Sequence, residues 1–360
     1  MKKAKNKANN RHRQRKLRIL FVSEYFYPRA AGGEIWSWEL CTELAARGHE
    51  VTVIACRHDK SPPAERARGV RIIRPVKAGS ERVTRKIAAM RLVSYVKRHI
   101  ETHRGIDVIH TMAYAVSAGV SALARRHGIP CVTSVHSYFG RDWRRIASTG
   151  GFIQWYERKT LKDDKSSVIH VPSEYLRRRI RQDTGKDSMV IHNWVTDKFP
   201  DERPMPKRTL LFVGSLEPVK NPLACLKAAK ARNARLVVIG SGSLEDEMRE
   251  RAIQERVNVI FLNDVKREDT LGYIGGASLV LVPSVTESFS LVALEAVAQG
   301  TPVSGTPVGI LPELPGIIPF PPKRIPERLP EGIKKAIRRK FSRAAAIKRF
   351  EATYLAILAH

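Results

Sequence analysis

The sequence predicts an α/β protein made of two doubly wound domains in tandem. Short apolar segments that fit buried strands alternate with longer segments of helical periodicity. This alternation stops at residues 198–207, a segment with three prolines, and then starts again. The 360 residues are enough for about two domains. Each half should therefore form a parallel sheet with helices on both faces.

The first half opens with a strand–helix–strand unit. Leu17–Ser23 (LRILFVS) fits a buried strand, a turn with Gly32–Gly33 follows, and helix Ile35–Arg47 leads to strand His49–Cys56. The glycines would let the backbone approach a ligand at the helix N-terminus, although Gly-Gly pairs are common in turns. Further strands are expected at 69–75, 107–112, 129–136 and 167–172, and further helices at 83–100, 113–127 and 174–181, with 189–193 ending this half.

Two basic segments of this half have two interpretations each. Residues 1–16 are polar and basic, which indicates a disordered arm, and a tether to anionic membrane or nucleic acid is the second interpretation. The expected helix 83–100 carries apolar residues at helical spacing beside lysines and arginines. We favour packing on the core with a solvated basic face, and the alternative is a helix that lies on an anionic membrane.

His136 ends the expected strand 129–136. A single histidine usually has a structural role. The carboxyl end of a parallel strand, however, faces the ligand crevice of an open α/β sheet. We therefore favour a functional role for His136.

The second half repeats the pattern and contains two notable glutamates. Glu287 lies in the polar turn after strand 279–282, and Glu295 is the only charge in the apolar segment 291–298. A buried carboxylate is costly unless donors meet it, so a salt bridge or cap explains Glu295 taken alone. Together, at a strand end and a helix N-terminus, the two favour a ligand site. Other strands are expected at 209–213, 235–239 and 257–262, and helices at 222–231, 244–253, 267–274, 291–299 and 342–358.

Composition limits the partners and the location. The net charge of +29 indicates anionic partners, which include phosphate-bearing substrates, acidic lipid and nucleic acid. The four cysteines show no close pair and no metal-ligand spacing, which indicates buried, reduced thiols in a cytosolic protein. No apolar run reaches about 18 residues, so no membrane-spanning helix is expected, and no apolar segment follows the basic N-terminus as in a secretory signal.

The motifs, taken in order, resemble those of the GT-B glycosyltransferases, most closely the retaining enzymes of glycosyltransferase family 4. The resemblance covers nearly the whole chain from Leu17 onward. Its most specific motif, ESFSLVALEA (287–296), fits the E-x7-E pattern of the family, and FVGSLEPVKN (212–221) resembles its donor diphosphate loop. Further similar segments are GTPV (300–303), VGILPEL (308–314), IGSGSLEDEMRE, SEYLRRRI and IHNWVTDKF.

The resemblance implies two Rossmann-like domains that face each other across a cleft. Residues 17–197 would form the acceptor-side domain, joined by the C-terminal helix 342–360, and residues 208–341 would bind the nucleotide sugar. The implied reaction is the retaining, metal-independent transfer of a hexose from a UDP- or GDP-type sugar to a glycan or lipid-linked acceptor, without a cofactor. The cysteines and the basic residues, apart from the resemblance, predict the location: the cytoplasm, with peripheral contact at the cytoplasmic face of an anionic membrane.

The resemblance also implies roles for individual residues. The catalytic residues would be Glu287, which contacts the hydroxyls of the donor sugar, His136, which faces that sugar, and Lys220, which holds the diphosphate. Glu295 would bind the ribose. The other implied donor-binding residues are Gly33, Gly214, Ser215, Gly240, Val265, Phe289, Ser290 and Leu291, and Gly32 and Gly33 would also face the acceptor.

Charge explains why these residue types suit the reaction. Negative charge grows on the leaving phosphate and needs a fixed positive group. The chain has no Asp-x-Asp motif, so Lys220 and a helix N-terminus, equivalent to roughly half a charge, are expected to act in place of a metal. Ser215 stands where the family usually has an arginine, which removes one of two expected cations. Ser288 and Ser290 replace common glycines and should cost little if only their amides matter.

Two other functions fit the same residues. One is a nucleotide-sugar epimerase on the same fold. The other is a degenerate, highly basic protein that binds anionic lipid or RNA. Charge and Ser215 favour the binding protein, whereas Lys220, His136 and the two glutamates favour the enzyme. No aromatic motif of the RNA-binding type is visible.

Overall fold

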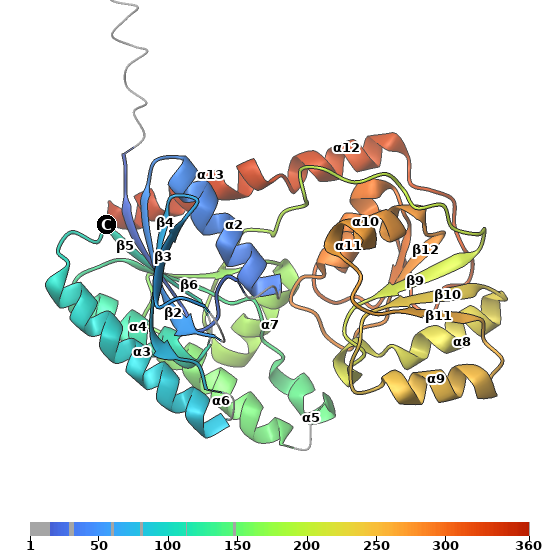
Figure 1. Cartoon of the computed structure of the whole chain (residues 1–360), viewed down its shortest axis with the longest axis horizontal. Coiled ribbons are helices and arrows are strands. Elements are labelled where there is room, and N and C mark those ends of the chain that lie inside the picture. Colours follow the sequence, from blue (N-terminus) through green and yellow to red (C-terminus); the bar gives the residue numbers. More distant parts are fainter. Residues whose placement is uncertain are drawn as a thin grey trace, which may run out of the picture. The chain divides into compact units, whose positions relative to one another are not determined.

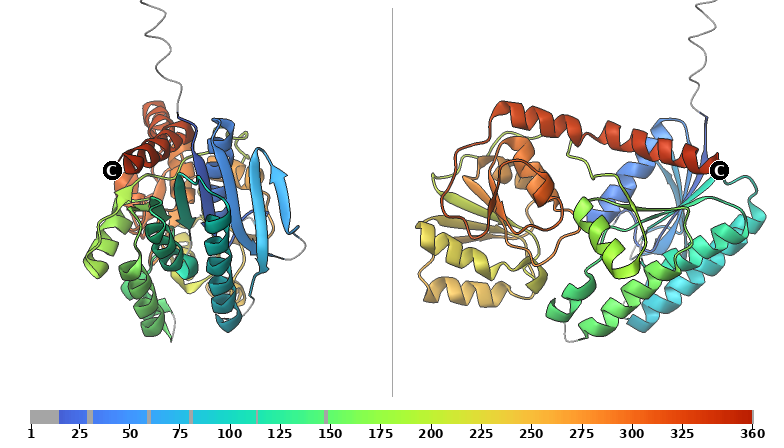
Figure 2. Two further views of the ribbon diagram at one scale, coloured as in Figure 1. Left: turned by 90° about the vertical axis from the view of Figure 1, so that its left-hand side faces the viewer. Right: turned by 180° about the vertical axis from the view of Figure 1, so that it is seen from behind.

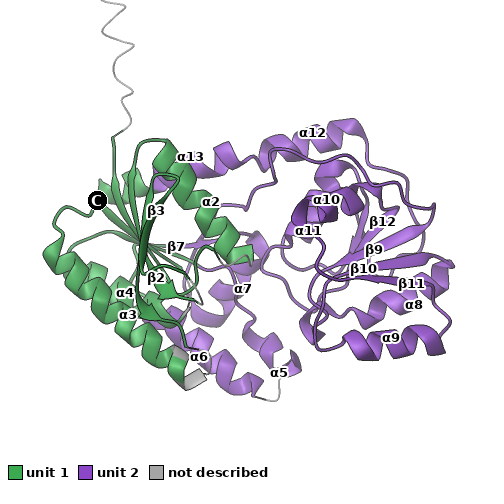
Figure 3. Ribbon diagram, in the orientation of Figure 1, with its two compact units in different colours: residues 1–134, 164–168, 354–360 green, residues 135–163, 169–353 purple. Residues whose placement is uncertain are grey.

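The structure is a computed structural model that describes residues 15–28, 32–58, 61–79, 82–112, 114–146 and 149–359. The chain divides into two compact units, coloured separately in Figure 3. Unit 1 comprises residues 1–134, 164–168 and 354–360, and unit 2 comprises residues 135–163 and 169–353. The predicted linker at 198–207 lies between the last strand of the first half and the first strand of the second, but inside unit 2. Residues 1–14 of the predicted arm lie outside the described residues.

Unit 1 contains a parallel sheet that ends in an antiparallel hairpin. Over its described residues the strand order is β3-β4-β2-β1-β5-β6. Strand β1 pairs in parallel with β2 on one side and with β5 on the other, and β3 pairs with β4 in the antiparallel sense. The strands are β1 (Arg18–Ser23), β2 (Glu50–Arg57), β3 (Ala64–Ala67), β4 (Val70–Lys77), β5 (Val108–Met112) and β6 (Cys131–Ser134).

Side-chain alternation along β1 supplies both faces of this sheet. Leu20 and Val22 belong to the core cluster formed with α3 (Arg82–Thr102) and α4 (Tyr114–Arg126). Phe21 points the other way, towards His110, which also meets Trp36 of α2 (Gly32–Ala46). Helices therefore cover both faces of the sheet, as the doubly wound prediction requires. Figures 1 and 2 show α3 and α4 together on one side of these strands and α2 on the other.

Unit 2 contains a parallel pair, β7 with β8, and a second sheet. Over the described residues this sheet has the order β11-β10-β9-β12-β13-β14, with parallel pairing in each register given. The strands are β7 (Val168–Val171, its first residue in unit 1), β8 (Met189–Val190), β9 (Thr209–Val213), β10 (Arg235–Ile239), β11 (Val259–Leu262), β12 (Leu279–Val282), β13 (Val303–Gly305) and β14 (Ile317–Pro319).

Alternation again divides the core of the second sheet between two helical layers. Leu211 and Val280 face the cluster that includes residues of α10, α11 and α12, whereas Leu210 and Leu281 face α8 and α9. The α/β class with two doubly wound sheets is confirmed. The helices of unit 2 are α5 (Trp143–Ile146), α6 (Gly150–Asp163), α7 (Glu174–Thr184), α8 (Leu223–Arg232), α9 (Glu245–Gln254), α10 (Arg267–Gly276), α11 (Leu291–Gln299) and α12 (Glu331–Lys340), and α13 (Arg343–Leu358) ends in unit 1.

The Gly-Gly pair has a different place from the one predicted. Gly32 and Gly33 form the first turn of α2 rather than the turn before it. A Cβ added at Gly33 would lie 2.7 Å from Cε of Met112, at the end of β5, whereas a Cβ at Gly32 would meet nothing within 4 Å. Because Cε is the flexible end of the Met112 side chain, this contact alone does not require glycine at position 33.

Two predictions about chemistry and location meet the structure here. All four cysteines are buried and form no disulfide, and burial raises the pKa of each thiol. Over the described residues, no helix combines the length and the apolar character that crossing a bilayer needs.

Candidate active site

The two best motifs of the sequence lie at one end of the second sheet. Strand β9 stands between β10 and β12, so the chain leaves β9 towards one side and later returns to its other side. In open parallel sheets, ligands bind beyond the carboxyl ends of strands at such a reversal. The segment from Gly214 to Asn221 follows β9, and the segment from Pro283 to Ser290 follows β12. The topology therefore brings the predicted diphosphate loop and Glu287 to the same edge.

Backbone contacts join these two segments directly. The Val285 N–H donates to the Val219 carbonyl at 2.9 Å, and the Asn221 side-chain amide donates to the Pro283 carbonyl at 3.3 Å. Asn221 has a φ of 51° and ends the 3₁₀ turn Pro218–Lys220, a left-handed position that asparagine tolerates. The position of Lys220 is thus set by the loop after β12 as well as by its own loop.

Lys220 and Glu287 form an ion pair at this junction. The Lys220 Nζ lies 2.7 Å from Glu287 Oε1, and the same oxygen accepts a hydrogen bond from Ser284 Oγ at 2.9 Å. The Lys220 side chain is 29% exposed and the Glu287 side chain is 11% exposed, so the pair is partly buried and still accessible. A partly buried cation beside a carboxylate can bind an anion on its free side, and the carboxylate can accept from sugar hydroxyls.

Gly214 and Gly240, two predicted donor-binding residues, lie against each other. A Cβ on Gly240 would fall 2.1 Å from the Gly214 carbonyl oxygen, and the two residues have φ values of 135° and 155° respectively. The ends of β9 and β10 thus come close only because Gly240 is glycine. Beside them, Ser215 is exposed, and Glu217 accepts from the amide and hydroxyl of Ser243 at 2.9 and 2.7 Å, which lowers its pKa.

The N-terminus of α11 corrects one expectation. Ser290, the residue before the helix, has a φ of 81°, in the left-handed region that costs a non-glycine residue roughly 1–2 kcal/mol. Serine at this position is therefore not nearly free of cost, contrary to the prediction. Phe289 is buried, Leu291 opens the helix, and the first N–H groups of a helix have no acceptor within it. Their binding of a diphosphate stays a prediction.

Glu295 is paired, as expected for a buried carboxylate. Arg267, the first residue of α10, donates through Nη2 to Glu295 Oε1. The glutamate side chain is 3% exposed, and the arginine is half exposed. The predicted donor-side residue Val265 is partly buried just before this helix. Pairing with Arg267 orients the Glu295 carboxylate, and the ribose contact stays a prediction.

His136 lies beyond the strand that was predicted to carry it. Strand β6 ends at Ser134, and the His136 ring is half-buried at 5.6 Å from the ring of His170. The segment after His136 is connected to the Glu287 loop through Arg179 of α7. That guanidinium donates to the Phe139 carbonyl at 2.5 Å and to Thr286 Oγ1 at 3.4 Å. Arg179 also pairs with Asp142 at 2.7 Å.

Glu157 of α6 binds the backbone of the segment that follows His136. Its Oε2 accepts from the N–H groups of Phe139 and Gly140 at 3.2 and 3.0 Å. Burial raises the pKa of this carboxyl from its ordinary 4.5 to about 7, because desolvation outweighs these hydrogen bonds. The backbone that follows His136 is therefore fixed by one buried acid and one partly buried arginine.

The N-terminus of α7 makes a second connection to the motifs. Ser173 caps the helix by accepting from Leu176 N–H and donates its hydroxyl to the Ser288 carbonyl at 2.6 Å. Glu313 accepts from the Glu174 N–H at 2.9 Å and contacts His192 Nε2 at 2.8 Å. Ser173 therefore holds the E-x7-E segment at Ser288, and Glu313 connects the VGILPEL segment (308–314) to α7 and His192.

Sequence reasoning missed four of these connecting residues as part of the site. Ser173 and Glu313 fall within quoted motifs but carry no pattern of their own. Arg179 is one of several arginines in SEYLRRRI, and Glu157 follows no recognised motif. Only packing distinguishes them. Gly32 and Gly33 lie in unit 1, whereas the other predicted site residues lie in unit 2. Over the described residues, no three His, Cys, Asp or Glu side chains gather as metal ligands.

Solved structures share the fold over most of the chain. Sucrose-phosphate synthase from Thermosynechococcus elongatus has a TM-score of 0.78 at 20% identity, and the match covers 96% of this chain and 100% of that one. Anabaena Alr3699/HepE, solved in complex with UDP, has a TM-score of 0.69 at 14% identity over 94% and 100% of the chains. The fold is therefore that of the GT-B glycosyltransferases.

Sequence relatives define the family. Residues 30–199 match Glycosyltransferase Family 4, and residues 196–349 match Glycosyl transferases group 1. An uncharacterized glycosyltransferase, MJ1607 of Methanocaldococcus jannaschii, is 28% identical over 83% of this chain and 82% of its own length. D-inositol 3-phosphate glycosyltransferase of Mycobacterium sp. strain KMS is 30% identical over 79% and 72%. The chain belongs to glycosyltransferase family 4, as the resemblance predicted.

Relief of the left-handed strain at the start of α11 is measurable. We expect Ser290→Gly to raise the free energy of unfolding by about 1 kcal/mol, because glycine adopts positive φ without a clash. Ser288→Gly is the matched control, since Ser288 is not among the described residues with positive φ, and it should lower stability. Urea unfolding of the three proteins tests this, and an equal change in both variants would contradict the assignment of strain to Ser290.

The raised pKa of Glu157 predicts a pH-dependent stability. The folded chain holds this proton more tightly than the unfolded chain, so the stabilisation is present below about pH 4.5 and is lost as pH rises to about 7. Wild type should therefore lose stability relative to Glu157→Gln over this interval, by on the order of 3 kcal/mol. Unfolding at several pH values measures the difference, with Glu331→Gln as an exposed control. A difference independent of pH would show an ordinary pKa.

Proposed function

We propose that the chain is a retaining, metal-independent hexosyltransferase that uses a nucleoside-diphosphate sugar, of the UDP or GDP type, and a glycan or lipid-linked acceptor. The observation that carries the proposal is the Lys220–Glu287 ion pair beyond the ends of β9 and β12. It sets a cation for the phosphates beside a carboxylate for the sugar hydroxyls. Membership of family 4 and the UDP bound by Anabaena Alr3699/HepE support a nucleotide-sugar donor.

In the proposed reaction, the bond between the sugar C1 and the phosphate oxygen breaks, and its electron pair leaves with the diphosphate. The acceptor oxygen forms the new bond to C1 on the face that the leaving group departs. The acceptor proton passes to the departing phosphate oxygen, so the products are the glycoside and the nucleoside diphosphate. Lys220 and the α11 N-terminus stabilise the charge that grows on the phosphate. Glu287 orients the sugar, and Glu295 binds the ribose.

Because Ser215 stands in place of the arginine that is usual in the family, Lys220 has to supply more of the positive charge for the diphosphate. Arg267 is engaged by Glu295, so it serves the ribose side of the proposed site rather than the phosphates. Arg179 is engaged by Phe139 and Asp142 and positions the His136 segment. We therefore assign most of the side-chain charge on the diphosphate to Lys220, with no metal ion and no cofactor in the reaction.

We propose the cytoplasm as the place of this reaction. Four buried, free cysteines with raised pKa values suit a reducing compartment, because thiols in oxidising compartments are commonly paired.

Loss of Lys220 should stop transfer. We expect Lys220→Ala to lower kcat/KM at least about 100-fold, as loss of a single oxyanion donor does in other enzymes. Lys227→Ala on α8 removes an exposed lysine of the same unit and should leave the rate unchanged. Release of nucleoside diphosphate, measured with and without acceptor, also separates a transferase from an epimerase. Near-normal turnover by Lys220→Ala would show that the diphosphate binds elsewhere.

Donor identity can be measured without knowledge of the acceptor. A ligand that binds only the folded chain raises its melting temperature, so we expect one class among UDP-, GDP- and ADP-sugars to stabilise the protein. Glu295→Gln should weaken the stabilisation even by a nucleoside diphosphate that carries no sugar, because the ribose is present there too. Glu287→Gln should weaken the stabilisation only by the sugar-bearing donor. Equal stabilisation of the wild type and of both variants by every donor would contradict the assigned roles.

A further inference from the structure

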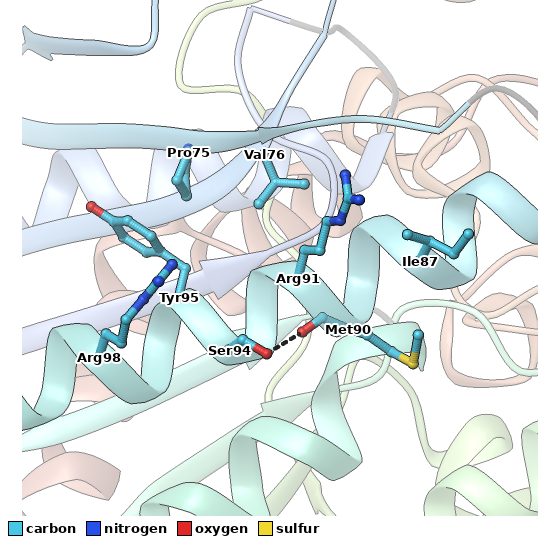
Figure 4. Close-up of a pocket in the computed structure, with 8 residues that line it drawn as sticks. All are labelled: Pro75, Val76, Ile87, Met90, Arg91, Ser94, Tyr95 and Arg98. Atoms are coloured by element: carbon cyan, nitrogen blue, oxygen red, sulfur yellow. Dashed lines mark hydrogen bonds between the residues drawn. The ribbon is translucent and has the colours of Figure 1, made fainter.

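A groove of about 400 Å³ opens between α3 and β4 of unit 1. Figure 4 shows Arg91 and Tyr95 pointing from the helix towards Pro75 and Val76 of the strand. We call this surface the α3 groove. Its lining residues are Pro75, Val76, Ile87, Met90, Arg91, Ser94, Tyr95 and Arg98.

Val76 and Tyr95 of the groove pack against the core of unit 1, whereas Ile87 and Met90 lie outside it. Helix α3 already buries one stripe, which includes Leu92 and Val96, against the sheet and α4. Ile87 and Met90 lie on a different stripe and are 39% and 57% exposed. The same stripe continues to Arg98 at helical spacing. Helix α3 therefore has a second face, with Ile87 and Met90 exposed outside the core cluster of unit 1.

Positive charge surrounds these apolar side chains. Lys86, Arg91, Lys97 and Arg98 are exposed on α3, and Lys77 is exposed at the end of β4. Over its whole length, α3 contains one acidic residue, Glu101, which lies 3.9 Å from Lys97. The Ser94 hydroxyl donates a hydrogen bond to the Met90 carbonyl at 3.0 Å. The face thus combines two exposed apolar side chains with a cluster of cations.

We propose that the α3 groove binds the surface of an anionic lipid bilayer. Ile87 and Met90 enter the boundary between headgroups and acyl chains, and the surrounding lysines and arginines bind lipid phosphates. Long basic side chains suit this place, because their stems pack on apolar surface while the charges stay in water. An amphipathic helix with apolar residues between cations lies in a membrane interface in this way.

The chemistry of the groove favours lipid over nucleic acid. Single-stranded RNA is bound by stacking bases on exposed aromatic rings. The aromatic residue of the groove, Tyr95, is partly buried, stacks on His99 at 6.5 Å and has Arg98 over its ring at 5.8 Å. The apolar side chains of Ile87 and Met90 form no hydrogen bond or ion pair with an RNA backbone, whereas a bilayer interface binds both apolar and cationic groups.

Electrostatic attraction by the cations and insertion of two apolar side chains are each of moderate strength, so we expect reversible binding. Each lysine or arginine close to an anionic surface contributes about a fivefold gain in partitioning, and the gain falls with salt because the Debye length is short. Two partly exposed apolar side chains add a modest contribution that is independent of salt. We therefore expect binding that needs anionic lipid and weakens strongly, without vanishing, as salt is raised.

The test is sedimentation of the full chain with vesicles. One preparation is phosphatidylcholine alone, and the other is an equal mixture of phosphatidylcholine and phosphatidylglycerol. We expect binding to the mixture and little binding to phosphatidylcholine alone. Arg91→Glu/Arg98→Glu should lower the partition coefficient at least about 25-fold, from two cations at about fivefold each. Ile87→Ser/Met90→Ser should lower the binding that persists at high salt.

Matched variants in unit 2 separate this surface from the general excess of positive charge. Lys227→Glu/Lys230→Glu makes the same charge change on exposed residues of α8, and Ile253→Ser removes a residue of α9 that is 80% exposed. Both should bind vesicles nearly as the wild type does. Equal losses in groove and control variants would show binding by net charge alone and overturn the proposal, as would absence of binding to the mixture. Wild-type binding by both groove variants would likewise overturn the proposal.

Discussion

The candidate site depends on the parallel pairing of β9 with β10 on one side and β12 on the other. Because all three strands point the same way, the segments that follow them emerge at one edge. Every proposed donor contact in unit 2 except that of His136 comes from residues that follow β9, β10, β11 or β12. The contacts between Val219 and Val285 and between Gly214 and Gly240 then bring these segments together within hydrogen-bond or van der Waals distance.

Charge compensation determines what each site residue can do. Glu287 forms an ion pair with Lys220 through Oε1, and Glu295 accepts a hydrogen bond from Arg267. Both carboxylates are therefore paired with a cation that orients them, and a carboxylate oriented in this way can accept from hydroxyl groups. Glu157 is different, since desolvation outweighs the hydrogen bonds that its carboxylate accepts, and its pKa rises to about 7. The first two suit ligand binding, and the third suits the support of a loop.

The large positive charge of the chain has several local uses. In unit 2, Arg179 connects the segment after His136 to Thr286, and Arg267 serves Glu295. On α3 of unit 1, by contrast, lysines and arginines surround exposed apolar residues at the surface. A net charge of +29 does not distinguish these uses, because each depends on the groups that lie beside a given cation. The proposed enzyme and the proposed membrane surface therefore draw on separate sets of basic residues.

The order of motifs and the periodicity of apolar residues determined the fold class, the family and the position of Glu287 and Glu295, because these depend on neighbours in sequence. Short elements without such a pattern, such as β3 and α6, were not predicted. Only the tertiary structure decided that Ser290 is strained, that Arg179, Arg267 and Ser173 support the site, and that α3 has a second exposed face. These are contacts between distant segments, and no local pattern encodes the partner of a side chain.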